Sequence, residues 1–390
     1  MKQLIALAFG PLLAGIILLL PEPLFNPLMD KILAACLWMV VWWITEAVSI
    51  SITALLPIVL FPLLGVSSIG QVTVHYANPI VFLFFGGFVI ALALEKVALH
   101  KRMALHILRL TGPKANGVIF GFMLATALLS MWISNTASTV VMLPMALSVY
   151  ALVKKKTKKN RKKLRRFALS LMLGIAAAAN IGGMATLIGT PPNSVMLAFL
   201  NEQYQIDIGF FQWMTFGVPL SGILLLLAYW IIVRWAYPSR LGLLDSAHDI
   251  IEDELRALGP MKRKERAVLT LFLMTVFGWV LRGQINEWWP ALSLTDTHIA
   301  MIGAIALFTI PVKKGAKPCV LQWDDTAKLP WGILILFGGG LALASALAQG
   351  GFIDAIQNFI SGQNQWSSVL ILIALVTLVL FLTELMSNVA

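Results

Sequence analysis

The sequence predicts an all-α polytopic membrane protein, because it is very apolar, its charges alternate between loops, and polar breaks interrupt its apolar segments. Of 390 residues, 59% are hydrophobic and 12% are charged, which lies outside the range of soluble globular domains. The apolar runs lack strict alternation, which favours helices over a β-barrel. Cys36 and Cys319 offer no disulfide framework. No cleavage site follows the apolar N-terminus, so we expect a retained first helix.

Lysine and arginine occur in alternate loops. The net charge is +11, and the basic residues cluster at 101–114, 154–166, 234–266 and 313–328. Neither residue occurs in the intervening loops, 66–78, 200–212, 283–295 and 350–365. The positive-inside rule then places the basic loops and the N-terminus in the cytoplasm. We expect the membrane to be the inner membrane of a bacterium. We expect the basic loops to contact anionic lipid headgroups rather than a nucleic acid.

A membrane span needs about 20 apolar residues. Spans are predicted at 4–20, 31–48, 50–65, 79–97, 213–236, 265–282, 296–312 and 330–349. Two further pieces, 98–112 and 350–361, are expected to lie on the membrane surface. A short cytoplasmic helix is predicted at 248–258.

Three apolar segments contain polar or helix-breaking residues. Segment 115–153 is broken by Ser134-Asn135-Thr136 and has basic residues at both ends, which predicts a re-entrant hairpin with the break at its tip. Segment 367–390 ends at a similar break, Ser387-Asn388. Segment 167–200 contains Asn180–Gly183 and Gly189–Asn193, which predict two half-helices joined by an unwound loop. An unpaired polar group costs several kcal/mol in lipid, so each break must face protein, water or a ligand.

The two halves of the chain repeat. Ser134 follows Gly87 by 47 residues, and Ser387 follows Gly339 by 48. Since the two halves enter the membrane from opposite sides, the repeat is inverted, as in secondary transporters. The predicted organisation is mostly scaffold at 1–78, a first repeat at 79–236, a cytoplasmic connector at 237–264 and a second repeat at 265–390. We expect the second repeat to be truncated at the tip of its hairpin, because a counterpart of 189–193 is missing.

These motifs together resemble the divalent anion:sodium symporter family. The residues that carry the resemblance are Thr45-Glu46-Ala47 through Thr53-Ala54-Leu55-Leu56-Pro57, Ser134-Asn135-Thr136, Ile188–Asn193 and Ser387-Asn388. The resemblance implies eleven spans and a homodimer of the elevator type. It also implies import of dicarboxylates or citrate with Na⁺ as the coupling ion and no cofactor. Some members of the family are sodium-independent exchangers, which remain the alternative.

The resemblance also implies roles for individual residues. Five would bind the substrate carboxylates: Ser134, Asn135, Thr136, Ser387 and Asn388. A first sodium ion would be held by Ser130, Ser134, Asn135 and a carbonyl near Gly183. A second would be held by Thr383, the Met386 carbonyl and Asn388. The loop Gly189, Thr190, Pro191, Pro192 and Asn193 would support these sites. Val389 stands where the family motif has Thr, which leaves the choice between succinate-like and citrate-like anions open.

The residue types fit this chemistry. Hydroxyl, amide and carbonyl oxygens suit a hard cation, and helix N-termini suit an anion. Ser130 and Thr383, each four residues before its motif, favour sodium coupling over exchange. An enzyme would need a nucleophile with a base or metal ligands inside apolar segments. The five histidines all fall in loops, surface pieces or helix starts, so we do not expect an enzyme. Nor do we expect an anion channel, because paired hairpins that close on one site suit occlusion better than a continuous pore.

Overall fold

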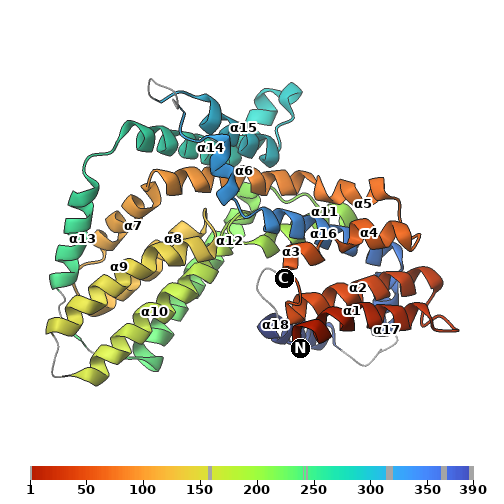
Figure 1. Cartoon of the computed structure of the whole chain (residues 1–390). Helices are drawn as coiled ribbons and strands as arrows, with labels where there is room; N and C mark the ends of the chain where they lie inside the picture. The colour runs from red at the N-terminus through yellow and green to blue at the C-terminus, as the bar shows by residue number, and fades with distance from the viewer. Residues whose placement is uncertain are drawn as a thin grey trace. The chain divides into compact units, whose positions relative to one another are not determined.

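The computed structural model describes residues 2–156, 160–239, 241–242, 245–312, 319–361 and 367–385. Every regular element among these residues is a helix, which confirms the predicted all-α class (Figure 1). Seven of the helices are long and apolar enough to cross a membrane, and shorter apolar helices accompany them. Length and composition therefore indicate an integral multi-pass membrane protein.

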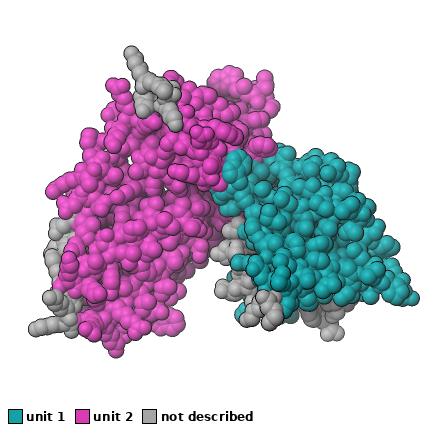
Figure 2. Space-filling view, in the orientation of Figure 1, with its two compact units in different colours: residues 1–81, 195–206, 330–390 teal, residues 82–194, 207–329 magenta. Residues whose placement is uncertain are grey.

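The chain folds into two compact units, shown in separate colours in Figure 2. Unit 1 comprises residues 1–81, 195–206 and 330–390, and unit 2 comprises residues 82–194 and 207–329. Helices α6, Pro79–Lys96, and α11, Pro191–Tyr204, each begin in one unit and end in the other. The assignment of segments to scaffold and repeats stays a prediction.

Unit 1 contains eight further helices. They are α1 Lys2–Leu18, α2 Pro27–Thr45, α3 Ile50–Thr53, α4 Leu56–Leu63, α5 Ile69–Tyr76, α16 Trp331–Gln349, α17 Phe352–Ser361 and α18 Ser368–Leu385. Glycines on α16 allow close packing against the N-terminal helices. A Cβ on Gly339 would lie 2.2 Å from the Ala54 carbonyl oxygen, and one on Gly338 would lie 2.2 Å from Tyr76 Cδ1. The glycine run on α16 is therefore a packing feature.

Unit 1 departs from the sequence predictions at three places. The helix predicted at 31–48 begins at Pro27, because Asn26 Oδ1 accepts the Met29 N–H at 2.8 Å and caps it. The span predicted at 50–65 is divided into α3 and α4. Residues 66–78 were expected to be a loop, but they contain helix α5. Ser68 and Gln71 form a capping box that begins this helix.

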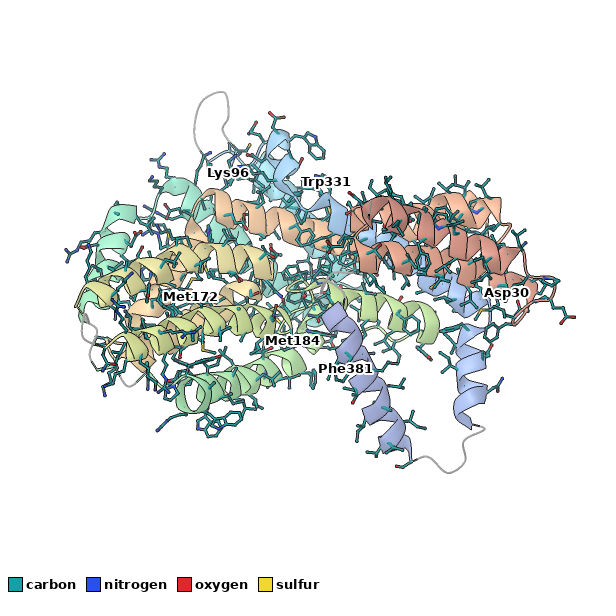
Figure 3. All side chains as sticks on the ribbon, turned by 60° about the horizontal axis from the view of Figure 1, so that its bottom comes forward. Asp30, Lys96, Met172, Met184, Trp331 and Phe381 are labelled. Atoms are coloured by element: carbon teal, nitrogen blue, oxygen red, sulfur yellow. The ribbon has the colours of Figure 1, made fainter. Side chains whose placement is uncertain are left out.

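Unit 2 contains the other eight α-helices. They are α7 Leu99–Leu110, α8 Ala115–Ser130, α9 Asn135–Lys156, α10 Arg161–Gly183, α12 Phe210–Trp230, α13 Asp245–Leu258, α14 Arg263–Trp288 and α15 Asp296–Thr309. Helices α8, α9 and α10 lie side by side in Figure 1 and share a buried core that includes Ile119, Phe122, Met142 and Phe167. Met172 of α10, labelled in Figure 3, packs against it.

The break in segment 167–200 lies later than predicted. Asn180–Gly183 was expected to interrupt the helix, but α10 continues through Gly183. The non-helical stretch is Met184–Thr190, and Pro191 and Pro192 begin α11 instead of lying in the loop. Proline is favoured in the first helical turn, where its missing N–H has no intrahelical acceptor to lose. The segment does contain two helices separated by a non-helical stretch, but α10 alone is 23 residues long and apolar enough to cross a membrane. The description of the two as half-helices stays a prediction.

The basic side chains of α7 pair with carboxylates. Lys101 Nζ lies 2.7 Å from Glu254, and Arg109 Nε lies 2.8 Å from Glu252, both on α13. Arg102 Nε lies 2.8 Å from Glu265 at the start of α14. These three side chains therefore have carboxylate partners within the protein, and their contact with lipid headgroups stays a prediction. Their acidic partners are 143 to 163 positions away in the sequence, so local charge patterning could not reveal them.

Arg102 joins three helices. Besides Glu265, its guanidinium donates to the carbonyl oxygens of Gly259 at 2.9 Å and Leu258 at 3.4 Å, at the C-terminal end of α13. The side chains of Arg102 and Glu265 are only 10% and 8% exposed. A buried charge that loses its partner keeps its full desolvation cost, so this pair is expected to matter far more than an exposed one.

Replacing Arg102 with alanine should destabilise the protein, because Glu265 would stay buried without its cation. We expect a loss of about 3–5 kcal/mol, measured as a fall in the unfolding temperature of detergent-solubilised protein. Arg256→Ala is the matched control, since Arg256 and Asp253 are 77% and 76% exposed and such pairs contribute little. Equal unfolding temperatures for the two variants would contradict this assignment.

Candidate functional site

The predicted hairpin consists of α8 and α9, and the polar motif lies where they join. Helix α8 ends at Ser130 and α9 begins at Asn135, with Met131–Ser134 between them. Ser134 Oγ accepts the Ala137 N–H at 3.2 Å, which caps the start of α9. The serine is therefore the N-terminal cap of α9, directly before Asn135.

The end of α10 packs directly against this hairpin tip. A Cβ on Gly182 would lie 2.2 Å from the Ala127 carbonyl oxygen of α8. A Cβ on Gly183 would lie 2.5 Å from Asn135 Oδ1. Real Cβ atoms do not approach other atoms this closely, so only glycine fits at either position without a shift. The contact brings the two breaks of unit 2 together.

Three oxygens converge at this contact. Ser130 Oγ lies 2.7 Å from Asn135 Oδ1 and 2.7 Å from the Ala179 carbonyl oxygen of α10. Ser130 is fully buried, and Asn135 is half-buried. A hydroxyl has one proton and two lone pairs. When Ser130 donates to Ala179, lone pairs on both Ser130 Oγ and Asn135 Oδ1 are free to coordinate a cation.

Helix ends give this region its electrostatic character. Helices α8 and α10 both end here, and the C-terminus of a helix has the partial charge of about −0.5 that favours a cation. Helix α9 begins here, and its N-terminus favours an anion. No charged residue occurs within 115–153 or 167–201. The region therefore combines a cation-favouring side and an anion-favouring side without a formal charge from these segments.

The supporting loop is held by hydrogen bonds from Asn193, which the sequence assigned to it, and from Thr186, which the sequence did not assign. Asn193 Nδ2 lies 3.1 Å from the Gly183 carbonyl oxygen and 2.8 Å from that of Thr186. Thr186 Oγ1 donates to the Met131 carbonyl oxygen at 2.5 Å. Met184, labelled in Figure 3, begins this stretch directly after α10. The loop is thus tied to both the hairpin tip and the start of α11.

Other predicted residues lie near this contact or outside the described structure. Thr136 is exposed on the first turn of α9, and Gly189 lies against Gly183, where a Cβ would be 2.5 Å from its carbonyl oxygen. Thr383 falls within α18, but its side chain lies outside the described residues. Met386, Ser387 and Asn388 also lie outside them. Among the described residues, the structure thus brings together three residues predicted for the first sodium site, Ser130, Asn135 and Gly183.

Three residues that the sequence did not assign to the site contact the hairpin tip: Asn180, Phe210 and Phe272. Asn180 Oδ1 accepts a hydrogen bond from Asn135 Nδ2 at 3.1 Å. Trp132 packs edge-on against Phe272 at a ring distance of 4.9 Å and stacks with Phe210 at 6.3 Å. The position of Asn180, a polar residue within an apolar segment, is a sequence feature that could have indicated a role in the site. Nothing in the sequence indicated which aromatic rings Trp132 would meet.

Comparisons with known proteins agree with these features. The whole chain, residues 1–390, matches the family model described as the sodium:sulfate symporter transmembrane region. A sodium-dependent dicarboxylate transporter SdcS of Staphylococcus saprophyticus is 39% identical over 396 residues, covering all of this chain and 76% of that protein. The transporter of the same name in Staphylococcus aureus strain USA300 is 40% identical over 394 residues, with the same coverage.

Replacing Gly183 with alanine should displace Asn135, because the new Cβ would overlap its side-chain oxygen. We expect the sodium concentration for half-maximal thermal stabilisation to rise by about tenfold or more, equivalent to about 1.4 kcal/mol. The matched control is Gly222→Ala on α12, where a Cβ would meet nothing within 4 Å. If both variants respond to sodium like the unmodified protein, the contact between Gly183 and Asn135 does not shape a sodium site.

Proposed function

The chain belongs to the sodium:sulfate symporter family, and on that basis we propose that it imports di- or tricarboxylate anions coupled to sodium ions. Succinate-, malate- and fumarate-like or citrate-like anions are the candidate substrates. The curated relatives named as sodium-dependent dicarboxylate transporters support this substrate class. The family is one of transporters, and we assign no catalytic residue and no cofactor besides the coupling ion.

The observation that carries the proposal is the group of oxygens around Ser130. Ser130 Oγ lies within hydrogen-bond distance of Asn135 Oδ1 on the next helix and of the Ala179 carbonyl oxygen, 49 residues along the chain. Sodium is a hard cation that takes oxygen ligands, and two helix C-termini add negative potential. Ser134 Oγ and the Gly183 carbonyl complete the proposed first sodium site. Both already accept one hydrogen bond, which leaves each oxygen a further lone pair.

The substrate would bind on the other side of the hairpin tip. The N-terminus of α9 can receive a carboxylate, with Ser134, Asn135 and Thr136 as hydrogen-bonding groups. Because 115–153 and 167–201 contain no lysine or arginine, these segments cannot balance a dianion by themselves. Bound sodium would supply that positive charge. This requirement gives a physical reason for coupling substrate binding to sodium binding.

We assign the second half of the site to the motif Ser387-Asn388, near the end of the second repeat. Ser387 and Asn388 would complete the carboxylate contacts, while Thr383, the Met386 carbonyl and Asn388 would hold a second sodium ion. This assignment rests on the repeated spacing of the sequence and on the family resemblance. In the same way, we propose a homodimer of the elevator type in the inner membrane of a bacterium, with the N-terminus in the cytoplasm.

Simple electrostatics supports at least two sodium ions per substrate. Moving one charge across 100 mV changes the free energy by about 2.3 kcal/mol. Import of a dianion into a negative interior therefore costs roughly 4.6 kcal/mol at that potential. Two sodium ions cancel this electrical cost, and a third would make the membrane potential drive import.

Uptake into proteoliposomes tests the proposed function. We expect labelled succinate or citrate to accumulate when sodium is present outside, with more than first-order dependence on the sodium concentration. Choline in place of sodium should abolish accumulation. Equal uptake in choline would show a sodium-independent exchanger, and counter-flow of unlabelled substrate from inside would then identify that mechanism.

Ser130→Ala should weaken sodium coupling, because it removes one oxygen of the proposed first sodium site. We expect the sodium concentration for half-maximal uptake to rise by about tenfold, for a loss of about 1.4 kcal/mol. Ser148→Ala on the same hairpin is the matched control, since this exposed serine only donates to the Pro144 carbonyl oxygen of its own helix. An unchanged sodium dependence in Ser130→Ala would remove Ser130 from the site.

A further inference from the structure

The side-chain amide of Asn135 has different neighbours at its two ends. Its oxygen lies 2.7 Å from Ser130 Oγ, and its nitrogen lies 3.1 Å from Asn180 Oδ1. Asn180 belongs to the last turn of α10, three residues before Gly183, and its side chain is exposed. The hydrogen bond between the two asparagines therefore joins α10 to the first residue of α9.

The orientation of this amide decides whether Asn135 can hold a cation. Only the oxygen end of an amide has lone pairs to coordinate a cation, while the nitrogen end carries two hydrogens. A rotation of 180° about χ2 would exchange the two ends and turn the hydrogens toward Ser130. The amide would then repel sodium at the place where the oxygen would bind it. Some neighbour must favour one orientation over the other.

Asn180 supplies that preference when its side-chain oxygen, rather than its nitrogen, faces Asn135, as it does here. With its oxygen toward Asn135, it accepts from the nitrogen end and leaves the oxygen end facing Ser130. Ser130 alone does not decide the orientation, because its hydroxyl can donate to Asn135 or to Ala179, both at 2.7 Å. Gly183 lies against Asn135 Oδ1 without contributing a side chain. The acceptor on Asn180 is thus the side-chain group on α10 that distinguishes the two ends of the amide.

We propose that Asn180 is a positioning residue for sodium: its side-chain oxygen holds the Asn135 amide with the oxygen toward the cation site. This proposal rests on the proposed function and adds to it a residue that sets the affinity for the coupling ion. Asn180 does not itself contact sodium in this arrangement. Its acceptor, rather than its size, is what the site requires.

Two nearly isosteric variants separate the acceptor from the volume. Asn180→Leu removes the acceptor, and we expect the sodium concentration for half-maximal uptake to rise about three- to tenfold, as for the loss of one hydrogen bond. Asn180→Asp keeps acceptor oxygens and cannot present hydrogens when ionised, so the sodium affinity should be retained or raised. Its added negative charge should instead raise the KM for the dianion. Asn116→Ala, at an exposed position on the first turn of α8, is the control.

Three measurements decide the outcome: the sodium dependence of uptake, the substrate KM at saturating sodium, and the unfolding temperature without sodium. A loss of sodium affinity in Asn180→Leu, retained in Asn180→Asp, with similar unfolding temperatures, supports the proposal. Equal sodium affinity in all variants overturns it while leaving sodium symport intact. Equal losses in both Asn180 variants, accompanied by lower unfolding temperatures, overturn it in favour of a packing role. Absence of any sodium response in the unmodified protein overturns both this proposal and the proposed function.

Discussion

The close approach of α10 to the tip of the α8–α9 hairpin is the contact on which the candidate site depends. It is possible only because Gly182 and Gly183 present no side chains toward Ala127 and Asn135. The same contact places Ala179 and Asn180, one turn earlier on α10, beside Ser130 and Asn135. A single helix-packing requirement therefore fixes four polar groups from three helices in one place.

The site is built from neutral groups, and this choice has consequences for the ion it can hold. Carboxylate ligands would bind divalent ions strongly, whereas hydroxyl, amide and carbonyl oxygens interact more weakly with any cation. A transporter must also release its ion, so moderate affinity is an advantage. The ligands carry no formal negative charge, but the site is buried. Away from water, the attraction between the cation and the negative helix ends is screened less. The fully buried Ser130 lies at the most protected part of the group.

The sequence predicted the helical class, the two polar breaks of the first half and most of the helices, because these depend on local hydrophobicity and on rare polar residues. It did not predict that α10 continues through Asn180–Gly183. Asparagine and glycine are poor helix formers, but packing of the small glycines against α8 outweighs that preference. The partners of Arg102 and Lys101 also could not be predicted, because they depend on contacts between distant segments. For the same reason, the sequence marks Asn180 as a polar interruption of an apolar segment but does not identify it as the partner of Asn135.

Asn135 occupies the boundary between the two proposed sites, and this position bears on how they are coupled. Its side-chain oxygen belongs to the cation group, while its backbone begins α9, whose N-terminus would receive the anion. A shift of this residue changes both sites at once, so an ion that holds it in place also prepares the helix N-terminus for the anion. By reciprocity, a bound anion must then strengthen sodium binding by the same free energy. Coupling of this kind needs no signal over a distance, since one residue and the hydrogen bonds around it serve both ligands.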